Sequence, residues 1–287
     1  MGSAWAQTSY QSLDISYHVR SLGMSGSGVA DVLGADVSSL NPALLSGKEK
    51  TLILSAVRYP ATVQSQLAEW RMTVKGVSIA ATFRGVNYGN FKERDRDGND
   101  LGSFSAGDAW LNVAVAKSLS PLADVGISAG MFQSSVGDVT AVLGLVSLGG
   151  RVTIPQLETS LGVSVRNLGT TVQEYTSHTE MIPTSVALGV TRKMEYLPLT
   201  LSADAVWWEQ RSLFRLGGEF ALPKGLFLQL GTSSFRSDLQ TGELWRDIAS
   251  GFSLGFGYSL QRVSVGFAMA NSGVGGMSLG VGFSRRF

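Results

Sequence analysis

The chain has 287 residues and a formal net charge of +1, and only 16% of its residues are charged, against roughly 25% in ordinary soluble proteins. It has no cysteine, which excludes disulfides and thiolate metal sites, and no basic run of the kind that binds nucleic acid. Frequent glycine (35 residues) and 44% hydrophobic residues exclude a disordered chain and suit strands with small side chains on one face.

The N-terminus resembles the end of an export signal. Ala4-Trp5-Ala6 fits the A-x-A pattern of a signal-peptidase site, without the apolar stretch that normally precedes one. We expect residues 1–6 to be the tail of such a signal; a chance match in an ordinary N-terminus is the alternative. Residues 7–50 are then a separate N-terminal segment, and residues 51–287 form the main domain.

The N-terminal segment contains a glycine-rich stretch, residues 23–36, followed by Asn41-Pro42-Ala43. Pro42 is suited to the first position of a short helix, Asn41 to its N-cap and Gly47 to its end. We therefore predict a compact turn and helix before the first strand, and we take Asn41, Pro42 and Ala43 as the motif of this segment.

From residue 51 onward, apolar residues alternate with glycine, serine or polar residues. In residues 277–287 the apolar side chains fall on odd numbers, and in residues 252–260 they fall on even numbers. A period of two indicates strands with one apolar face and one small or polar face. About fourteen strands are predicted by this pattern, near 51–60, 64–75, 77–91, 104–118, 123–134, 139–148, 157–167, 184–194, 198–208, 213–222, 225–235, 249–260, 262–271 and 276–287.

Two architectures use such strands: a soluble β-sandwich, with the apolar face inward, and a transmembrane antiparallel β-barrel, with that face toward lipid. The even strand number and strand lengths near the 9–11 residues that cross a bilayer favour the barrel. Tight turns such as Lys75-Gly76 and Pro223-Lys224 alternate with long polar stretches at 92–104, 168–183 and 236–249, as in outer-membrane barrels.

Aromatic residues gather near the ends of the predicted strands, where an interfacial girdle is expected. They are Tyr59, Trp70, Tyr88, Phe91, Trp110, Trp207, Trp208 and Trp245. The last strand ends with Phe283 and Phe287, which resembles the C-terminal signal read by the outer-membrane assembly machinery. We predict a barrel in the bacterial outer membrane.

A barrel of about fourteen strands has a lumen too wide for side chains alone to fill, so residues 7–50 are predicted to form a plug or hatch inside it. Asp204 alternates with alanines and is expected to face the lumen, as are Arg215 and Glu219 on the next strand. We interpret these charges as a structural ion network, because barrel interiors are polar, and the lumen is expected to be lined by glycine, serine and charge.

No pattern of an enzyme, cofactor site or metal site stands out. Asp95, Asp97 and Asn99 match the start of a calcium-binding loop, but the later positions do not fit, and a hairpin turn at Asp97-Gly98 is the simpler interpretation. Neither histidine lies in a setting suited to a catalytic triad. We expect a protein without catalysis of its own, without a cofactor and without a nucleic acid partner.

Two segments resemble the PorV/PorQ family of outer-membrane proteins of the type IX secretion system, which is related in fold to the FadL-type transporters. The first, residues 23–45, carries Asp31, Asp36 and then Asn41-Pro42-Ala43. The second, residues 87–108, resembles the PorQ branch. The residues that carry this second resemblance are Tyr88, Gly89, Phe91, Gly98, Phe104, Ala106 and Asp108.

The resemblance implies a scaffold that anchors the cell-surface attachment complex, with PorZ-, PorU- and PorV-like proteins and outer-membrane lipid or lipopolysaccharide as partners. An apolar loop is the candidate contact surface, because exposed aromatic residues tend to mark interfaces. Its residues are Phe235, Leu239, Leu244 and Trp245. A FadL-like transporter of hydrophobic small molecules is the alternative function, and a soluble sandwich is the alternative fold.

Overall fold

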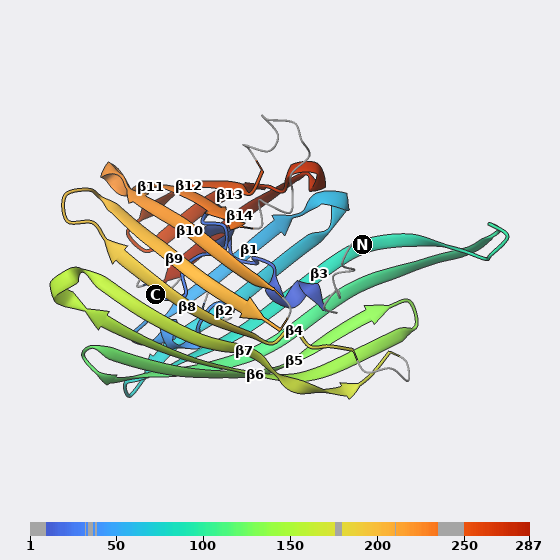
Figure 1. The fold of residues 1–287 in the computed structure, drawn as a ribbon, viewed down its shortest axis with the longest axis horizontal. Helices are drawn as coiled ribbons and strands as arrows, with labels where there is room; N and C mark the ends of the chain where they lie inside the picture. The colour runs from blue at the N-terminus through green and yellow to red at the C-terminus, as the bar shows by residue number, and fades with distance from the viewer. Residues whose placement is uncertain are drawn as a thin grey trace.

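The computed structural model describes residues 10–31, 33, 37, 39–175, 180–209, 211–234 and 250–287, with the backbone alone at residue 274. Fourteen antiparallel strands form a closed barrel in which each strand pairs with its neighbours in the sequence and β1 pairs with β14 (Figure 1). The predicted barrel is therefore confirmed, and the sandwich is excluded, because a sandwich leaves edge strands that a closed barrel does not have.

The strands have the following bounds: β1 Thr51–Arg58, β2 Gln64–Val74, β3 Val77–Arg94, β4 Asp100–Ser120, β5 Ala123–Val136, β6 Val139–Ile154, β7 Thr159–Gln173, β8 Ser185–Lys193, β9 Leu199–Trp208, β10 Ser212–Ala221, β11 Leu226–Ser233, β12 Phe252–Leu260, β13 Val263–Asn271 and β14 Met277–Arg286. Short 3-10 turns lie at Pro60–Thr62, Pro155–Leu157, Pro223–Gly225 and Gly273–Gly275. We call the end that carries residues 75–76, 121–122 and 261–262 the short-turn end, and the opposite end the loop end.

The outward face of the barrel is apolar, as the alternation requires. Large hydrophobic side chains on this face are exposed, among them Leu111 (64%), Met131 (58%) and Phe214 (58%). Soluble proteins rarely expose apolar patches larger than a few hundred Å², so a barrel with such a surface all round is suited to lipid. None of the helices in the described residues is long and apolar enough to span a membrane.

The predicted loop at residues 92–104 is wrong. β3 and β4 continue through it as one hairpin of 18 and 21 residues, which turns only at residues 95–99. The continuation is possible because Asp95 organises the turn: its carboxylate accepts hydrogen bonds from the backbone N–H of Asp97 and Asn99, at 2.9 and 2.8 Å. This hairpin extends well beyond the rest of the barrel in Figure 1.

Three short helices lie before β1. They are a 3-10 turn at Gln11–Asp14, helix α1 at Val19–Gly23 and a 3-10 turn at Pro42–Leu45. The turn at Pro42–Leu45 is completely buried, as is α1 apart from Arg20, whereas the first turn buries Ser12 and Leu13 and exposes Gln11. Helix α1 contacts strands β11 to β14 and β1, whereas Pro42–Leu45 contacts β3 to β6 on the other side of the barrel. The described N-terminal residues therefore cross the lumen from wall to wall.

Candidate functional site

The motif Asn41-Pro42-Ala43 attaches the N-terminal segment to the wall in the short-turn half of the lumen. Asn41 is completely buried, and its side-chain oxygen accepts the backbone N–H of Ala43 at 2.9 Å, as an N-cap does. Its amide nitrogen donates to the carbonyl oxygen of Val29 at 2.9 Å and to that of Gly150 in β6 at 3.1 Å. Asn41 thus joins two parts of the segment to one strand.

Glycine in the wall lets the segment approach the strands closely. A Cβ atom added at Gly149 would overlap the Asn41 side chain and lie 2.9 Å from Cδ of Pro42, and one added at Gly126 would lie 2.6 Å from the Pro42 carbonyl oxygen. Similar overlaps occur along the rest of the segment, at Gly162, Gly189, Gly217, Gly231 and Gly282. The small face of the alternating strands is therefore the surface on which the N-terminal segment packs.

The charged residues predicted to face the lumen do so, and they hold the segment. Asp204 in β9 accepts the backbone N–H of Gly28 at 2.6 Å and that of Val29 at 3.1 Å. Arg215 donates to the carbonyl oxygen of Gly26 at 3.1 Å. Glu219 accepts from Arg20 of helix α1 at 2.8 Å, and Arg20 also pairs with Asp31. These charges anchor backbone and side chains of the segment, which supports a structural role.

His18 is half-buried at the start of helix α1, where its Nδ1 accepts the backbone N–H of Arg20 at 3.1 Å. Burial, together with the nearby positive charges of Arg71 and Arg20, lowers the pKa of His18 to about 3. The imidazole is therefore neutral at physiological pH, and it acts as a hydrogen-bond acceptor at the helix N-terminus.

The loop half of the lumen is apolar, which the sequence analysis did not expect. A buried cluster, which we call the aromatic compartment, consists of Tyr10, Leu13, Trp110, Phe132, Ala141, Leu143 and Leu145, with Tyr175 and Ile182 packed against it. The prediction of a lumen lined only by glycine, serine and charge is wrong here. The signal was present in β6, where Ala141, Leu143 and Leu145 share the odd-numbered face of Ser147 and Gly149.

Polar groups at the edge of the aromatic compartment also fix the segment. Asp108 in β4 accepts hydrogen bonds from Ser12 and Ser134 and from the Tyr88 hydroxyl at 2.7 Å. The Arg84 guanidinium lies 3.4 Å from the ring centroid of Trp110 and 4.9 Å from that of Tyr17. A buried cation between two rings is stabilised by their negative faces, so Arg84 links the wall to the segment.

Several predicted positions lie elsewhere. Trp110 and Trp208 are buried in the lumen and do not belong to an interfacial girdle; Trp208 donates to Asp14 at 2.7 Å. Trp208 shares the even-numbered face of Asp204 in β9, which is the signal that was missed. Tyr59 and Tyr88 also turn their hydroxyls inward, Tyr59 to the carbonyl oxygen of Ser16 at 2.5 Å.

Phe283 and Phe287 occupy the outer surface of the last strand and its end. The Phe287 ring lies 5.3 Å from that of Trp70, and its backbone N–H donates to Lys50, so it packs at the junction of β14, β1 and β2. The candidate loop residues Phe235, Leu239, Leu244 and Trp245 lie outside the described residues, as do Asp36 and residues 1–6. Their assigned roles stay predictions.

The acidic turn has the hydrogen bonds of a structural hairpin. Both oxygens of the Asp95 carboxylate bond within the turn, the second to the Asn99 side chain at 2.8 Å, and these bonds lower the pKa of Asp95. Among the described residues, no group of three or more His, Asp or Glu side chains is arranged to hold a metal ion.

The hairpin of β3 and β4 is a second candidate surface. β2 pairs with β3 only as far as Asn87, and β5 pairs with β4 only from Ala106. Among the described residues, no third strand pairs with residues 90–94 or 100–104, which form a two-stranded ribbon with two open edges. Phe91 and Phe104 stack on it with ring centroids 5.5 Å apart, and Leu101 is 59% exposed.

Comparison with known proteins finds similar folds but no similar sequence. No protein-family model matches the chain, and no curated protein matches it. The solved structure of the toluene transporter TodX from Pseudomonas putida superposes with a TM-score of 0.65 at 11% identity, covering 94% of this chain and 98% of TodX. The chain has a FadL-type barrel fold.

Two further solved structures have a similar barrel fold. The CymD monoaromatic hydrocarbon channel has a TM-score of 0.66 at 12% identity, covering 95% of this chain and 98% of CymD. A Pseudomonas aeruginosa FadL homologue has a TM-score of 0.59 at 10% identity, covering 93% and 96%. TodX is a transporter and CymD is a channel; at such identities the likeness establishes the fold alone.

Proposed function

We propose that this chain is an outer-membrane scaffold that binds other proteins, in the manner of the PorQ-like component of a type IX secretion system. It would hold PorZ-, PorU- or PorV-like partners at the membrane without catalysis of its own. Its FadL-type fold is that of outer-membrane barrels, and its apolar outer face suits this location.

The projecting ribbon is the observation that carries this proposal. Strands of 18 and 21 residues are about twice as long as the 9–11 residues needed to cross a bilayer, so the ribbon extends past the membrane at the loop end. Open strand edges accept an extended segment of a partner by main-chain hydrogen bonds. The same residues, from Tyr88 to Asp108, carry the resemblance to the PorQ branch.

The attachment of the N-terminal segment inside the lumen also supports a binding role. Hydrogen bonds from Asn41, Asp204 and Arg215 attach the N-terminal segment to three strands. A scaffold requires no open path, so a barrel closed in this way is suited to it.

Removal of the ribbon tests this proposal. In the register of β3 and β4, Asn90 lies opposite Ser105, so Asn-Gly can replace residues 91–104 as a two-residue hairpin turn. We expect the shortened protein to remain a heat-modifiable barrel in outer membranes but to lose PorZ-, PorU- or PorV-like proteins on affinity purification from detergent extracts.

A matched control replaces the neighbouring turn Gly137-Asp138 with Asn-Gly and keeps the ribbon. Equal partner recovery from all three proteins would contradict a ribbon contact, and absence of such partners from the wild type would contradict the scaffold.

The second candidate is transport of hydrophobic small molecules, and the aromatic compartment favours it. Inside a barrel, Trp110, Phe132, Leu143 and Leu145 form an apolar site that Tyr10 of the N-terminal segment occupies. The TodX and CymD structures, which are a toluene transporter and a monoaromatic hydrocarbon channel, support this candidate more directly than they support the scaffold.

Uptake separates the two candidates. A transporter should admit radiolabelled toluene into cells that express it, and removal of residues 91–104 should leave uptake unchanged because the ribbon lies outside the compartment. A scaffold should show partner loss in that variant and no uptake above cells that lack the protein.

A further inference from the structure

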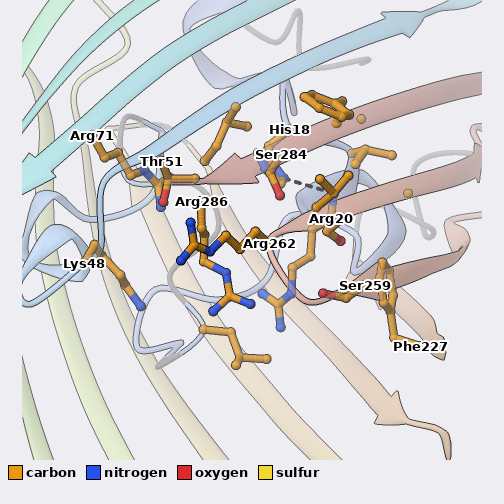
Figure 2. A pocket seen from close by; sticks show the side chains of 18 of the residues that line it. His18, Arg20, Lys48, Thr51, Arg71, Phe227, Ser259, Arg262, Ser284 and Arg286 are labelled. Atoms are coloured by element: carbon orange, nitrogen blue, oxygen red, sulfur yellow. Dashed lines mark hydrogen bonds between the residues drawn. The ribbon is translucent and has the colours of Figure 1, made fainter. Parts of the chain in front are cut away.

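A second, basic cavity lies at the short-turn end of the lumen, away from both the ribbon and the aromatic compartment. Its volume is about 510 Å³, and it lies between the N-terminal segment and strands β1, β2 and β11 to β14 (Figure 2). Five cationic side chains line it: Arg20, Lys48, Arg71, Arg262 and Arg286. In the part of the chain that the structure describes, the carboxylates that line it with them are Glu49 and Glu219.

Three of these cations form ion pairs with carboxylates of the described residues. Arg20 pairs with Asp31 and Glu219, Arg71 with Glu69, and Arg286 with Glu49 at 3.5 Å. These bonds leave Nη2 of Arg20 buried and without a hydrogen-bond acceptor in the part of the chain that the structure describes. That atom is not accessible from the cavity, whereas Arg262 and Arg286, which line the cavity and are exposed, can donate to an added anion.

Apolar side chains also line the cavity. The Phe227 ring lies against the backbone of Gly257 and Gly266, and Val19 of helix α1 and Ile53 of β1 also line the space. A site that contains both guanidinium groups and an aromatic ring is suited to a ligand with an anionic group and an apolar group.

We propose that this cavity binds a phosphate group from the short-turn side of the barrel, either as a free anion or as the head group of a phosphate monoester. A phosphate monoester carries close to two negative charges and three acceptor oxygens at neutral pH, which matches several convergent cations better than a single carboxylate does. The arginine side chains supply the planar donor pairs that bind phosphate. This inference does not depend on the scaffold or the transport function.

The environment of Lys48 is consistent with an electropositive site. Burial, with the nearby charges of Arg71 and Arg151, lowers the pKa of Lys48 to about 8, and Arg20 acts in the same direction while Asp31 opposes it. A bound phosphate would favour the protonated lysine. Its affinity should therefore fall as the pH rises from 7 to 9.5, a range in which the phosphate keeps its charge.

The test is titration calorimetry on the full chain, purified in a maltoside detergent, which contains no phosphate. The probes are octyl phosphate, inorganic phosphate and uncharged octanol. We expect octyl phosphate to bind, and Lys48→Gln and Arg262→Gln each to weaken it about tenfold, the usual effect of losing one charge-assisted hydrogen bond. Arg262 is exposed at the rim of the cavity, so its replacement does not endanger folding.

Lys193→Gln is the matched control, because Lys193 lies exposed at the short-turn end of β8, away from the cavity. Inorganic phosphate that binds as tightly as octyl phosphate identifies the free anion as the source, and octyl phosphate binding alone identifies the monoester. Octanol that binds as well as octyl phosphate, equal affinities in Lys48→Gln and Lys193→Gln, or no binding of either phosphate overturns the proposal.

Discussion

The two halves of the lumen hold the same N-terminal segment by different physical means. In the short-turn half, glycines of the wall meet the backbone of the segment, and buried polar groups such as Asn41 and Asp204 form directed hydrogen bonds. In the loop half, Tyr10 and Leu13 pack against aromatic and aliphatic side chains. The contacts of Asn41 depend on close approach and hydrogen bonds, whereas those of Tyr10 depend on filling an apolar volume. The two halves should therefore respond differently to mutation.

Gly149→Val should have the largest effect. The added side chain overlaps Asn41 and Pro42, and relief requires the segment to leave the wall; overpacking costs about 1–3 kcal/mol, and the lost hydrogen bonds of Asn41 add to it. We expect residues 41–46 to lose hydrogen-exchange protection and become open to protease. Gly144→Val is the control on the same strand, since a Cβ there meets no atom within 4 Å. Equal protection in both variants would mean that the close approach is not needed.

Tyr10→Ala should come next, with its effect confined to the loop half. Truncation of a buried ring that touches Phe132 and Tyr175 costs about 3 kcal/mol and leaves an apolar cavity. We expect lower thermal stability and new binding of toluene by calorimetry, because empty apolar cavities take up small hydrocarbons. Tyr10→Phe keeps the volume and should bind none. Protection of residues 41–46 should not change, and its loss would show that the halves are coupled.

Asn41→Ala should destabilise the short-turn attachment by about 2 kcal/mol. It removes the helix cap and leaves the buried carbonyl oxygens of Val29 and Gly150 without this donor. Hydrogen exchange of residues 41–46 measures the effect. Asn41→Ser is the comparison, because serine can restore the cap to Ala43 but does not reach both carbonyls. If the two variants behave alike, the cap alone accounts for the role of Asn41.

The smallest effect near neutral pH is a pH dependence limited to the short-turn half, which grows as the pH falls. The pKa of His18 is about 3 in the folded protein against 6.5 for a free histidine, so only the released segment gains a proton as the pH falls below about 6.5. The free energy that holds the segment in place is therefore constant above this pH. It falls by about 1.4 kcal/mol per pH unit between about pH 6.5 and pH 3. Protection factors of residues 19–24, corrected for intrinsic exchange, should fall accordingly.

His18→Asn keeps a side-chain acceptor for the N–H of Arg20 and should abolish this dependence. Tyr10, whose pKa is raised to about 12 mainly by burial, stays neutral over the same range. Protection around Tyr10 therefore provides the internal comparison. A slope that persists in His18→Asn would assign the titration to another group.

Strand period and local capping were determined by the sequence alone. Alternation of side chains is a property of a single strand, so it predicts fourteen strands, their apolar face and the inward direction of Asp204 before any pairing is known. The cap of Asn41 on Ala43 is also local, because donor and acceptor are two residues apart. The soluble sandwich was excluded only by the pairing of β1 with β14, which joins residues more than 200 positions apart.

Only the tertiary structure decided what each inward face meets. Trp110 and Trp208 are of a residue type that is common at membrane interfaces. They lie in the lumen because the N-terminal segment packs there. The ribbon exists because β2 and β5 end before β3 and β4 do. The basic cavity joins Arg20, Lys48 and Arg262, which no local pattern connects. Periodicity is fixed by neighbours along the chain, whereas contacts across the lumen are fixed by barrel closure and register.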